Sequence, residues 1–132
     1  MTTTESIIAA SENAPRIGLP LLREVPPAIL KRRPKPGKWS AHERACHLAA
    51  VHPLMVGRLD LMLSERLPEI KPYLPHLDDD PDALLKVDLN EALDRFARER
   101  EDLIRRLRSL SESDWARTAA HGSTPIIRYS LC

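Results

Sequence analysis

Three histidines, His42, His47 and His52, follow one another at intervals of five residues in a single stretch of the chain. On a helix, a step of five residues rotates a side chain by about 140°. A helical pair of metal ligands instead needs a spacing of three or four residues, which places both side chains on one face. These imidazoles cannot converge on one metal ion. We expect His47 to lie toward the buried half of the helix, His42 to face water and His52 to lie at the border.

The residues before these histidines define where the helix starts. Ser40 and Glu43 form a capping box, in which the hydroxyl accepts the third helical N–H and the carboxylate reaches back to the cap. The pattern predicts a helix from Ser40 to about Arg66, with Cys46 on its exposed face. Its expected apolar stripe is Ala45, Leu48, Val51, Met55, Leu59 and Met62. Arg58 lies on the same flank as His47.

A second capping box, Asp88 with Glu91, predicts a helix over residues 89–110. Arg100 falls inside the apolar stripe of that helix, where a guanidinium must find a partner or extend to the edge. One interpretation is a bent side chain at the edge of the bundle. The other is an arginine that orients a buried carboxylate or a ligand. After this helix we expect a short turn that packs Trp115 over the end of the bundle.

The proline-rich segments are expected to separate the helices. Residues 1–14 are predicted to form a loose tail or a single helical turn, and three breakers end any longer helix: Pro15, Gly18 and Pro20. The first helix should break near Pro26 and turn six side chains inward: Leu19, Leu21, Leu22, Val25, Ile29 and Leu30. Residues 31–38 are interpreted as a solvated basic connector, with a contact to an anionic ligand as the alternative.

Residues 67–82 are rich in Pro and Asp and are predicted to form a crossover loop between helices that are not nearest antiparallel neighbours. His76 and the three aspartates that follow it could suggest a cation site. The segment lacks the glycine and the terminal glutamate of a calcium loop. We therefore interpret it as a solvated acidic turn.

Composition favours one all-α domain over residues 1–132, since hydrophobic residues make up 42% and charged residues 30% of the chain, which holds 4 glycines. The 20 basic and 19 acidic residues leave a net charge of +1. This balance gives no general attraction to nucleic acid or to an anionic membrane, and neither is an expected partner. Two cysteines form no disulfide framework, and no apolar run approaches a membrane span, so we expect a cytoplasmic protein.

An ordered set of residues resembles the DinB-like superfamily, a group of metalloenzyme-like proteins. The first part is Pro-Gly-Lys-Trp-Ser at residues 36–40, followed by Glu43, His47-Leu48 and Arg58. The second part extends over residues 89–115 and comprises Ala92-Leu93, Phe96, Arg100, Leu107, Leu110 and Asp114-Trp115. The likeness covers residue 22 to the C-terminus in the same order. It implies an up-down four-helix bundle, in which Thr124-Pro125 would begin a truncated or incomplete fourth helix.

The resemblance also implies a divalent metal, commonly nickel or zinc, held by three histidines. One of them matches His47. The other two form a His-x-x-x-His pair on the fourth helix, and the given sequence does not contain that pair. His121 is a second candidate donor, although it precedes the matching helix. Without the resemblance, a lone histidine on a buried flank is more often a hydrogen-bonded core residue than a ligand.

Two classes of function follow. The family implies a metal-dependent hydrolase or thiol S-transferase that acts on a small thiol, with His47 as a ligand and three residues orienting ligands around it: Glu43, Arg58 and Arg100. The alternative is a non-catalytic helical module that binds itself or another protein. Three amphipathic helices would leave an apolar groove, so we expect a homodimer that closes it, unless the N-terminal region fills it.

Overall fold

The computed structural model describes residues 2–65, 68–70, 80–121 and 124–130, with side chains described up to Arg117. The chain is mostly helical, as predicted. The helices are α1 (Thr3–Glu24), α2 (Pro27–Leu30), α3 (Ala41–Ser64), η1 (Ala83–Lys86), α4 (Leu89–Ser109) and α5 (Glu112–Trp115). The strands are β1 (Glu69–Ile70), β2 (Thr118–His121) and β3 (Thr124–Ser130).

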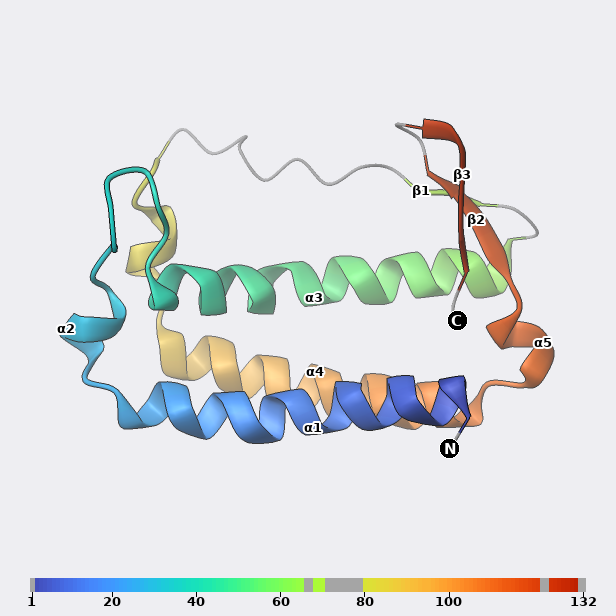
Figure 1. Ribbon diagram of the computed structural model, residues 1–132, viewed down its shortest axis with the longest axis horizontal. Coiled ribbons are helices and arrows are strands. Elements are labelled where there is room, and N and C mark those ends of the chain that lie inside the picture. The colour runs from blue at the N-terminus through green and yellow to red at the C-terminus, as the bar shows by residue number, and fades with distance from the viewer. Residues whose placement is uncertain (1, 66–67, 71–79, 122–123, 131–132) are drawn as a thin grey trace.

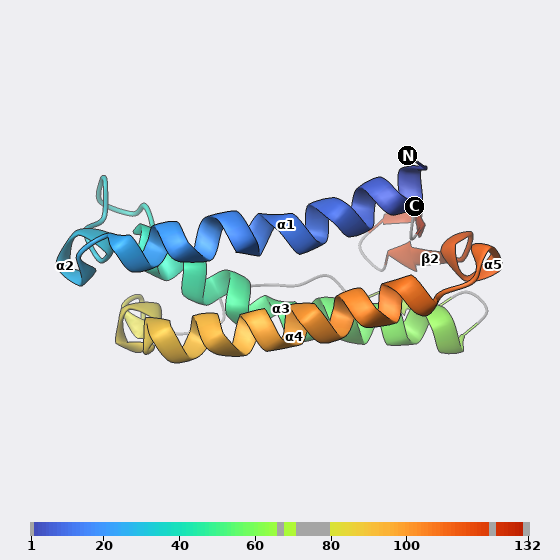
Figure 2. The same ribbon diagram turned by 90° about the horizontal axis from the view of Figure 1, so that it is seen from below.

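The long helices form a bundle in which α4 packs against both α3 and α1 (Figure 1; Figure 2). Helix α1 runs antiparallel to α3, whereas α3 and α4 run in the same direction (Figure 1). The end of α3 and the start of α4 therefore lie at opposite ends of the bundle. This agrees with the predicted crossover, although most of residues 67–82, including His76, lies outside the described residues. Among the described residues, no helix combines the length and apolar character needed to cross a bilayer.

The capping signals place the helix starts correctly. The Ser40 hydroxyl accepts the Glu43 N–H at 3.1 Å, and Glu43 Oε1 accepts the Ser40 N–H at 3.1 Å. Helix α4 begins after Asp88, whose side chain accepts the Glu91 N–H at 3.0 Å, but Glu91 does not return the hydrogen bond, so only half of this capping box forms. Such local hydrogen bonds depend on neighbouring residues alone, which is why the sequence predicts them well.

The prediction of a loose N-terminal tail is wrong, because α1 is one helix that contains Pro15 and Pro20. It starts with a capping box formed by Thr2 and Glu5. A proline inside a helix removes one hydrogen bond and clashes with the preceding turn. Tertiary contacts hold α1 in the bundle. Arg100 of α4 donates at 3.0 Å to the carbonyl oxygen of Ser11, which lies four residues before Pro15 and so lacks its usual helical N–H partner. The predicted break near Pro26 is confirmed, since α1 ends and α2 begins on either side of it.

The buried face of α3 matches the predicted stripe at Ala45, Leu59 and Met62 but not at Leu48 and Met55, which are exposed. His42 and Cys46, both expected on the exposed face, have only 3% and 2% of their surface accessible. Cys46 packs with Ala49 and Ala92, and His42 Nε2 lies 3.1 Å from the Leu84 carbonyl oxygen. Small side chains let two helices approach closely, so the contact between α3 and α4 follows Cys46 and Ala49 rather than the largest apolar residues.

Trp115 covers one end of the bundle, as predicted, where it packs with Leu59, Ile104 and Leu107. The next segment differs from the prediction. Thr124–Ser130 is a strand paired antiparallel with β2, and not the first turn of another helix. The described strands form a sheet in the order β1, β2, β3, with β1 parallel to β2. The run Ile126-Ile127 suits a strand, and residues 128–130 of the same strand are paired with β2.

The burial of Cys46 leads to a prediction about the reactivity of its thiol. Desolvation raises the pKa of its thiol, which disfavours the reactive thiolate. In a Cys132→Ser background, we expect Cys46 to react with iodoacetamide at least tenfold more slowly in buffer than in urea. Mass spectrometry of timed samples measures this. Equal rates in the two solvents would show that the packing of α3 on α4 does not protect the thiol.

Candidate functional site

His47 is the residue that the family resemblance selects as a metal ligand. It lies half-buried on α3, and its ring centroid is 4.9 Å from that of Trp39 in the preceding connector. His121, the second candidate donor, belongs to β2, and its side chain is not among those described. This ring contact packs His47 against the connector that precedes α3.

Glu43 is fully buried and forms an ion pair with Arg33. Two parallel hydrogen bonds of 2.8 Å join the guanidinium to the two carboxylate oxygens. Arg33 also donates to the Pro81 carbonyl oxygen at 2.8 Å and lies 3.1 Å from Asp82. The hydrogen bonds from Arg33 lower the pKa of Glu43 to about 2, while the paired carboxylate raises the pKa of Arg33. Glu43 therefore holds the basic connector against the start of α3.

Most of that connector is exposed, as predicted. Arg33 is the exception, and no signal in the sequence distinguishes it from its neighbours Lys31 and Arg32. The anion that it contacts is a carboxylate of the same chain. The positive charge of Arg33 is therefore sufficient to stabilise the ionised carboxylate of Glu43.

Arg100 and His52 form the second buried polar group. Arg100 Nε donates to His52 Nε2 at 3.0 Å, and Arg100 Nη1 donates to the Ser11 carbonyl oxygen at 3.0 Å. The guanidinium also lies over the Phe96 ring, 5.0 Å from its centroid. Since these residues belong to α4, α3 and α1, Arg100 links the three long helices. We expected a guanidinium in an apolar stripe to have hydrogen-bond partners, and His52 and the Ser11 carbonyl oxygen are those partners.

The hydrogen bond from Arg100 fixes the tautomer of His52. Because Nε2 accepts, the proton of the neutral imidazole must lie on Nδ1. That atom is 3.7 Å from Glu99 Oε2, and both atoms are buried without a hydrogen-bond partner. Burial and the positive charge of Arg100 lower the pKa of His52, partly opposed by Glu99. His52 is therefore a neutral hydrogen-bonding residue of the bundle.

Two of the predicted site residues, Glu43 and Arg100, have other partners among the described residues. Glu43 pairs with Arg33, and Arg100 pairs with His52 rather than with His47. Arg58 Nη1 lies 3.8 Å from Met55 Sδ on the same helix. Among the described residues, no three His, Cys, Asp or Glu side chains are grouped so that they could hold a metal ion. These residues do not fit a centre with three protein ligands.

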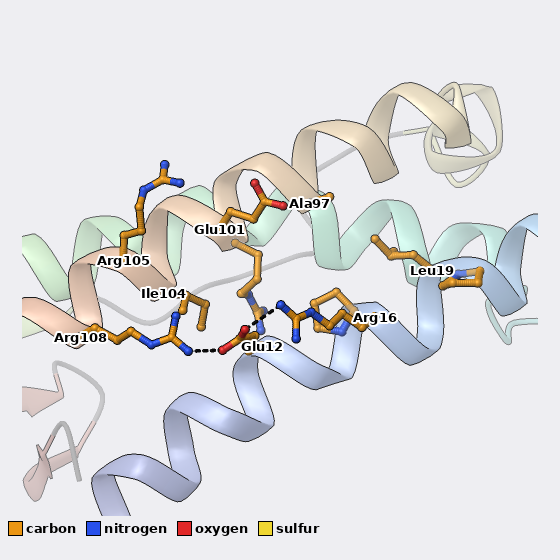
Figure 3. Close-up of a pocket in the computed structure, with 11 residues that line it drawn as sticks. Glu12, Arg16, Leu19, Ala97, Glu101, Ile104, Arg105 and Arg108 are labelled. Atoms are coloured by element: carbon orange, nitrogen blue, oxygen red, sulfur yellow. Dashed lines mark hydrogen bonds and ion pairs between the residues drawn. The ribbon is translucent and has the colours of Figure 1, made fainter.

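Two clefts flank α4. The smaller, of about 340 Å³, lies between α3 and α4 and is lined by His52, Glu99 and Leu103 among others. The larger, of about 430 Å³, lies between α1 and α4 (Figure 3). Arginine and glutamate side chains surround its opening, while Leu19 and Ile104 contribute apolar wall. Of the residues discussed above, Arg100 lines this larger cleft.

Comparison with known proteins relates most of the chain to one family. The model of the DinB superfamily matches residues 12–129. A search among curated proteins finds no match. Among solved structures, the chain is similar to YfiT from Bacillus subtilis, described as a probable metal-dependent hydrolase with an unusual four-helix bundle topology. The TM-score is 0.86 at 21% sequence identity, over 99% of this chain and 75% of the YfiT chain, which confirms the expected fold.

Proposed function

Because this chain belongs to the DinB superfamily, we propose that it uses the family's helical scaffold as a binding module whose partner is a second copy of itself. The observation that carries the proposal is the exposure of large aliphatic side chains on both helices that pack against α4. Contiguous exposed apolar surface on a folded protein commonly marks an interaction site.

Two aliphatic stripes supply this surface. On α1, Ile17 and Leu21 lie one turn apart with 67% and 57% of their surface exposed. On α3, Leu48 and Met55 lie two turns apart with 58% and 44% exposed. Leu21 was predicted to turn inward, and Leu48 and Met55 were predicted to lie in the core. These three side chains are instead largely exposed in the folded chain.

A second copy is the partner that best suits such stripes. In a dimer with twofold symmetry, the same surface of each subunit meets its equivalent, so the surface must be complementary to itself. Aliphatic side chains meet this condition because they need no opposite charge. The net charge of +1 adds little repulsion between two copies.

A metal-dependent hydrolase is the second candidate, supported by the description of YfiT and by the position of His47. The described donors do not form a three-ligand centre. A reaction at a metal would therefore need donors from another chain or from residues that the structure does not describe.

One experiment separates the two candidates. Protein purified without an affinity tag is sized by multi-angle light scattering, and its metal content is measured by elemental mass spectrometry on the same fractions. We expect a dimer that contains far less than one metal ion per chain. A monomer, or about one nickel or zinc ion per chain that is lost in His47→Ala, would overturn the binding-module proposal.

A pair of variants locates the interface. Leu21→Glu combined with Leu48→Glu should shift the dimer to a monomer at micromolar concentration, because both stripes would then bring like charges together. Leu54→Glu is the matched control, since Leu54 is also exposed on α3 but lies about 120° around the helix from Leu48. If the control dissociates the dimer equally, the interface is elsewhere.

A further inference from the structure

Arg100 carries a positive charge in a half-buried position with only uncharged partners. Its hydrogen bonds go to His52 Nε2 and to the Ser11 carbonyl oxygen, and its guanidinium lies over the Phe96 ring. Among the described side chains, no carboxylate lies within ion-pair distance of it. Burial also lowers the pKa of Arg100. A buried charge without a counter-ion is costly, which makes this arginine an attractive site for an anion.

The guanidinium has hydrogen-bonding capacity left for such an anion. An arginine side chain offers five N–H donors, and the described hydrogen bonds of Arg100 use the Nε donor and one Nη1 donor. Three N–H donors therefore remain, one on Nη1 and two on Nη2. A carboxylate can accept hydrogen bonds from donors on neighbouring guanidinium nitrogens.

Arg100 borders the cleft between α1 and α4, and the walls of that cleft are apolar. Leu19 on α1 and Ala97 and Ile104 on α4 line it, together with Pro15 and Pro20 (Figure 3). The volume of about 430 Å³ is in the range of ligand pockets. The site thus offers one polar anchor and an apolar surface beside it.

The charges at the opening favour an anion. Four arginines and two glutamates line the cleft: Arg16, Arg100, Arg105, Arg108, Glu12 and Glu101. Glu12 lies between two of the arginines, 2.7 Å from Arg16 and in an ion pair with Arg108 (Figure 3). The two glutamates offset two of the four arginines, and Arg105 is paired with Asp102 beside the cleft, so one positive charge remains in excess.

We propose that this cleft binds a small amphipathic monocarboxylate, with the carboxylate on Arg100 and the hydrocarbon part against Leu19, Ala97 and Ile104. The ligand would supply the counter-ion that Arg100 lacks and would cover apolar surface on α1 and α4. This proposal is independent of self-association, because it concerns a different surface from the stripes of Leu21 and Leu48.

Calorimetric titration with sodium octanoate, kept below its micellar concentration, tests the proposal. We expect saturable binding with one site per chain. Octan-1-ol has the same hydrocarbon chain without the charge, and it should bind roughly tenfold or more weakly, since hydrogen bonds between charged groups are lost. Equal affinities for octanoate and octanol, or no saturable binding of octanoate, would overturn the proposal.

Two variants assign the binding to this cleft. Arg100→Gln should weaken octanoate binding by roughly ten- to hundredfold, whereas Arg98→Gln, on an exposed position of the same helix that does not line the cleft, should leave it within twofold. Ala97→Phe fills the cleft and leaves Arg100 in place. It should also weaken octanoate binding, and so it tests the location of the site even if Arg100→Gln fails to fold. Unchanged affinity in Ala97→Phe, or in a folded Arg100→Gln, would show that octanoate binds elsewhere.

Discussion

Replacing Glu43 by alanine is expected to lower the free energy of unfolding by about 3 kcal/mol, the low end of the range for breaking a buried ion pair. The carboxylate is fully buried, it accepts two hydrogen bonds from Arg33, and it completes the capping box of α3. The low end applies because Arg33 is partly exposed and can regain water. Urea denaturation followed by circular dichroism measures the loss.

Glu91→Ala is the matched control, because Glu91 holds the same third helical position in α4 but is exposed. We expect it to change the free energy of unfolding by about 0.5 kcal/mol or less. Similar losses in the two variants would show that the effect belongs to the helix terminus and not to the ion pair with Arg33.

Acid should remove the contribution of Glu43 in a defined range of pH. Its pKa falls from an ordinary 4.5 to about 2 in the folded protein. A carboxylate with a lowered pKa stabilises the fold above its unfolded pKa, and this contribution disappears as the pH falls from about 4.5 toward 2. The stability of Glu43→Ala should therefore depend less on pH than that of the parent protein in this range.

His52→Ala is expected to destabilise the protein by roughly 2 to 3 kcal/mol. The substitution removes a buried ring that contacts Phe96 and takes the acceptor away from Arg100 Nε. An arginine left in the bundle without that acceptor costs more than the hydrogen bond itself is worth. The midpoint and slope of urea denaturation give the change, and a loss below 0.5 kcal/mol would contradict the proposed link between helices.

His52 should also make the fold sensitive to mild acid. Its pKa is lowered by burial and by Arg100, so the folded protein disfavours the protonated imidazole that the unfolded chain accepts. Stability is then fully present above the ordinary pKa of 6.5 and decreases as the pH falls below it toward the lowered value. Glu99 opposes the shift and limits its size.

His52→Gln tests this sensitivity, because the amide oxygen can still accept from Arg100 but does not titrate. We expect its stability to change less between pH 7.5 and pH 5.5 than that of the parent. This range lies above the one in which Glu43 titrates, so the two effects can be measured separately. An identical pH dependence in both proteins would assign the acid sensitivity to other groups.

For the candidate site, the sequence identified some residues but not their partners. Arg100 stood out because a guanidinium in an apolar stripe requires a partner, and the structure supplies His52 and the Ser11 carbonyl oxygen. Glu43 was recognised as a capping residue, yet its ion pair with Arg33 was not foreseen. The partners lie on other elements, and nothing in the local pattern specifies which side chain of a neighbouring helix will face them.

The sequence by itself determined the mostly helical character, the starts of α3 and α4, and the family, because caps and ordered motifs depend on residues close together in the chain. Tertiary contacts decided the continuity of α1, the buried face of α3 and the conformation of residues 124–130. Packing against α4 keeps α1 helical through Pro15 and Pro20, and a close approach at Cys46 and Ala49 sets the buried face of α3. Pairing with β2 makes Thr124–Ser130 a strand. In each case, contacts between distant segments outweigh a local preference worth only a few kcal/mol.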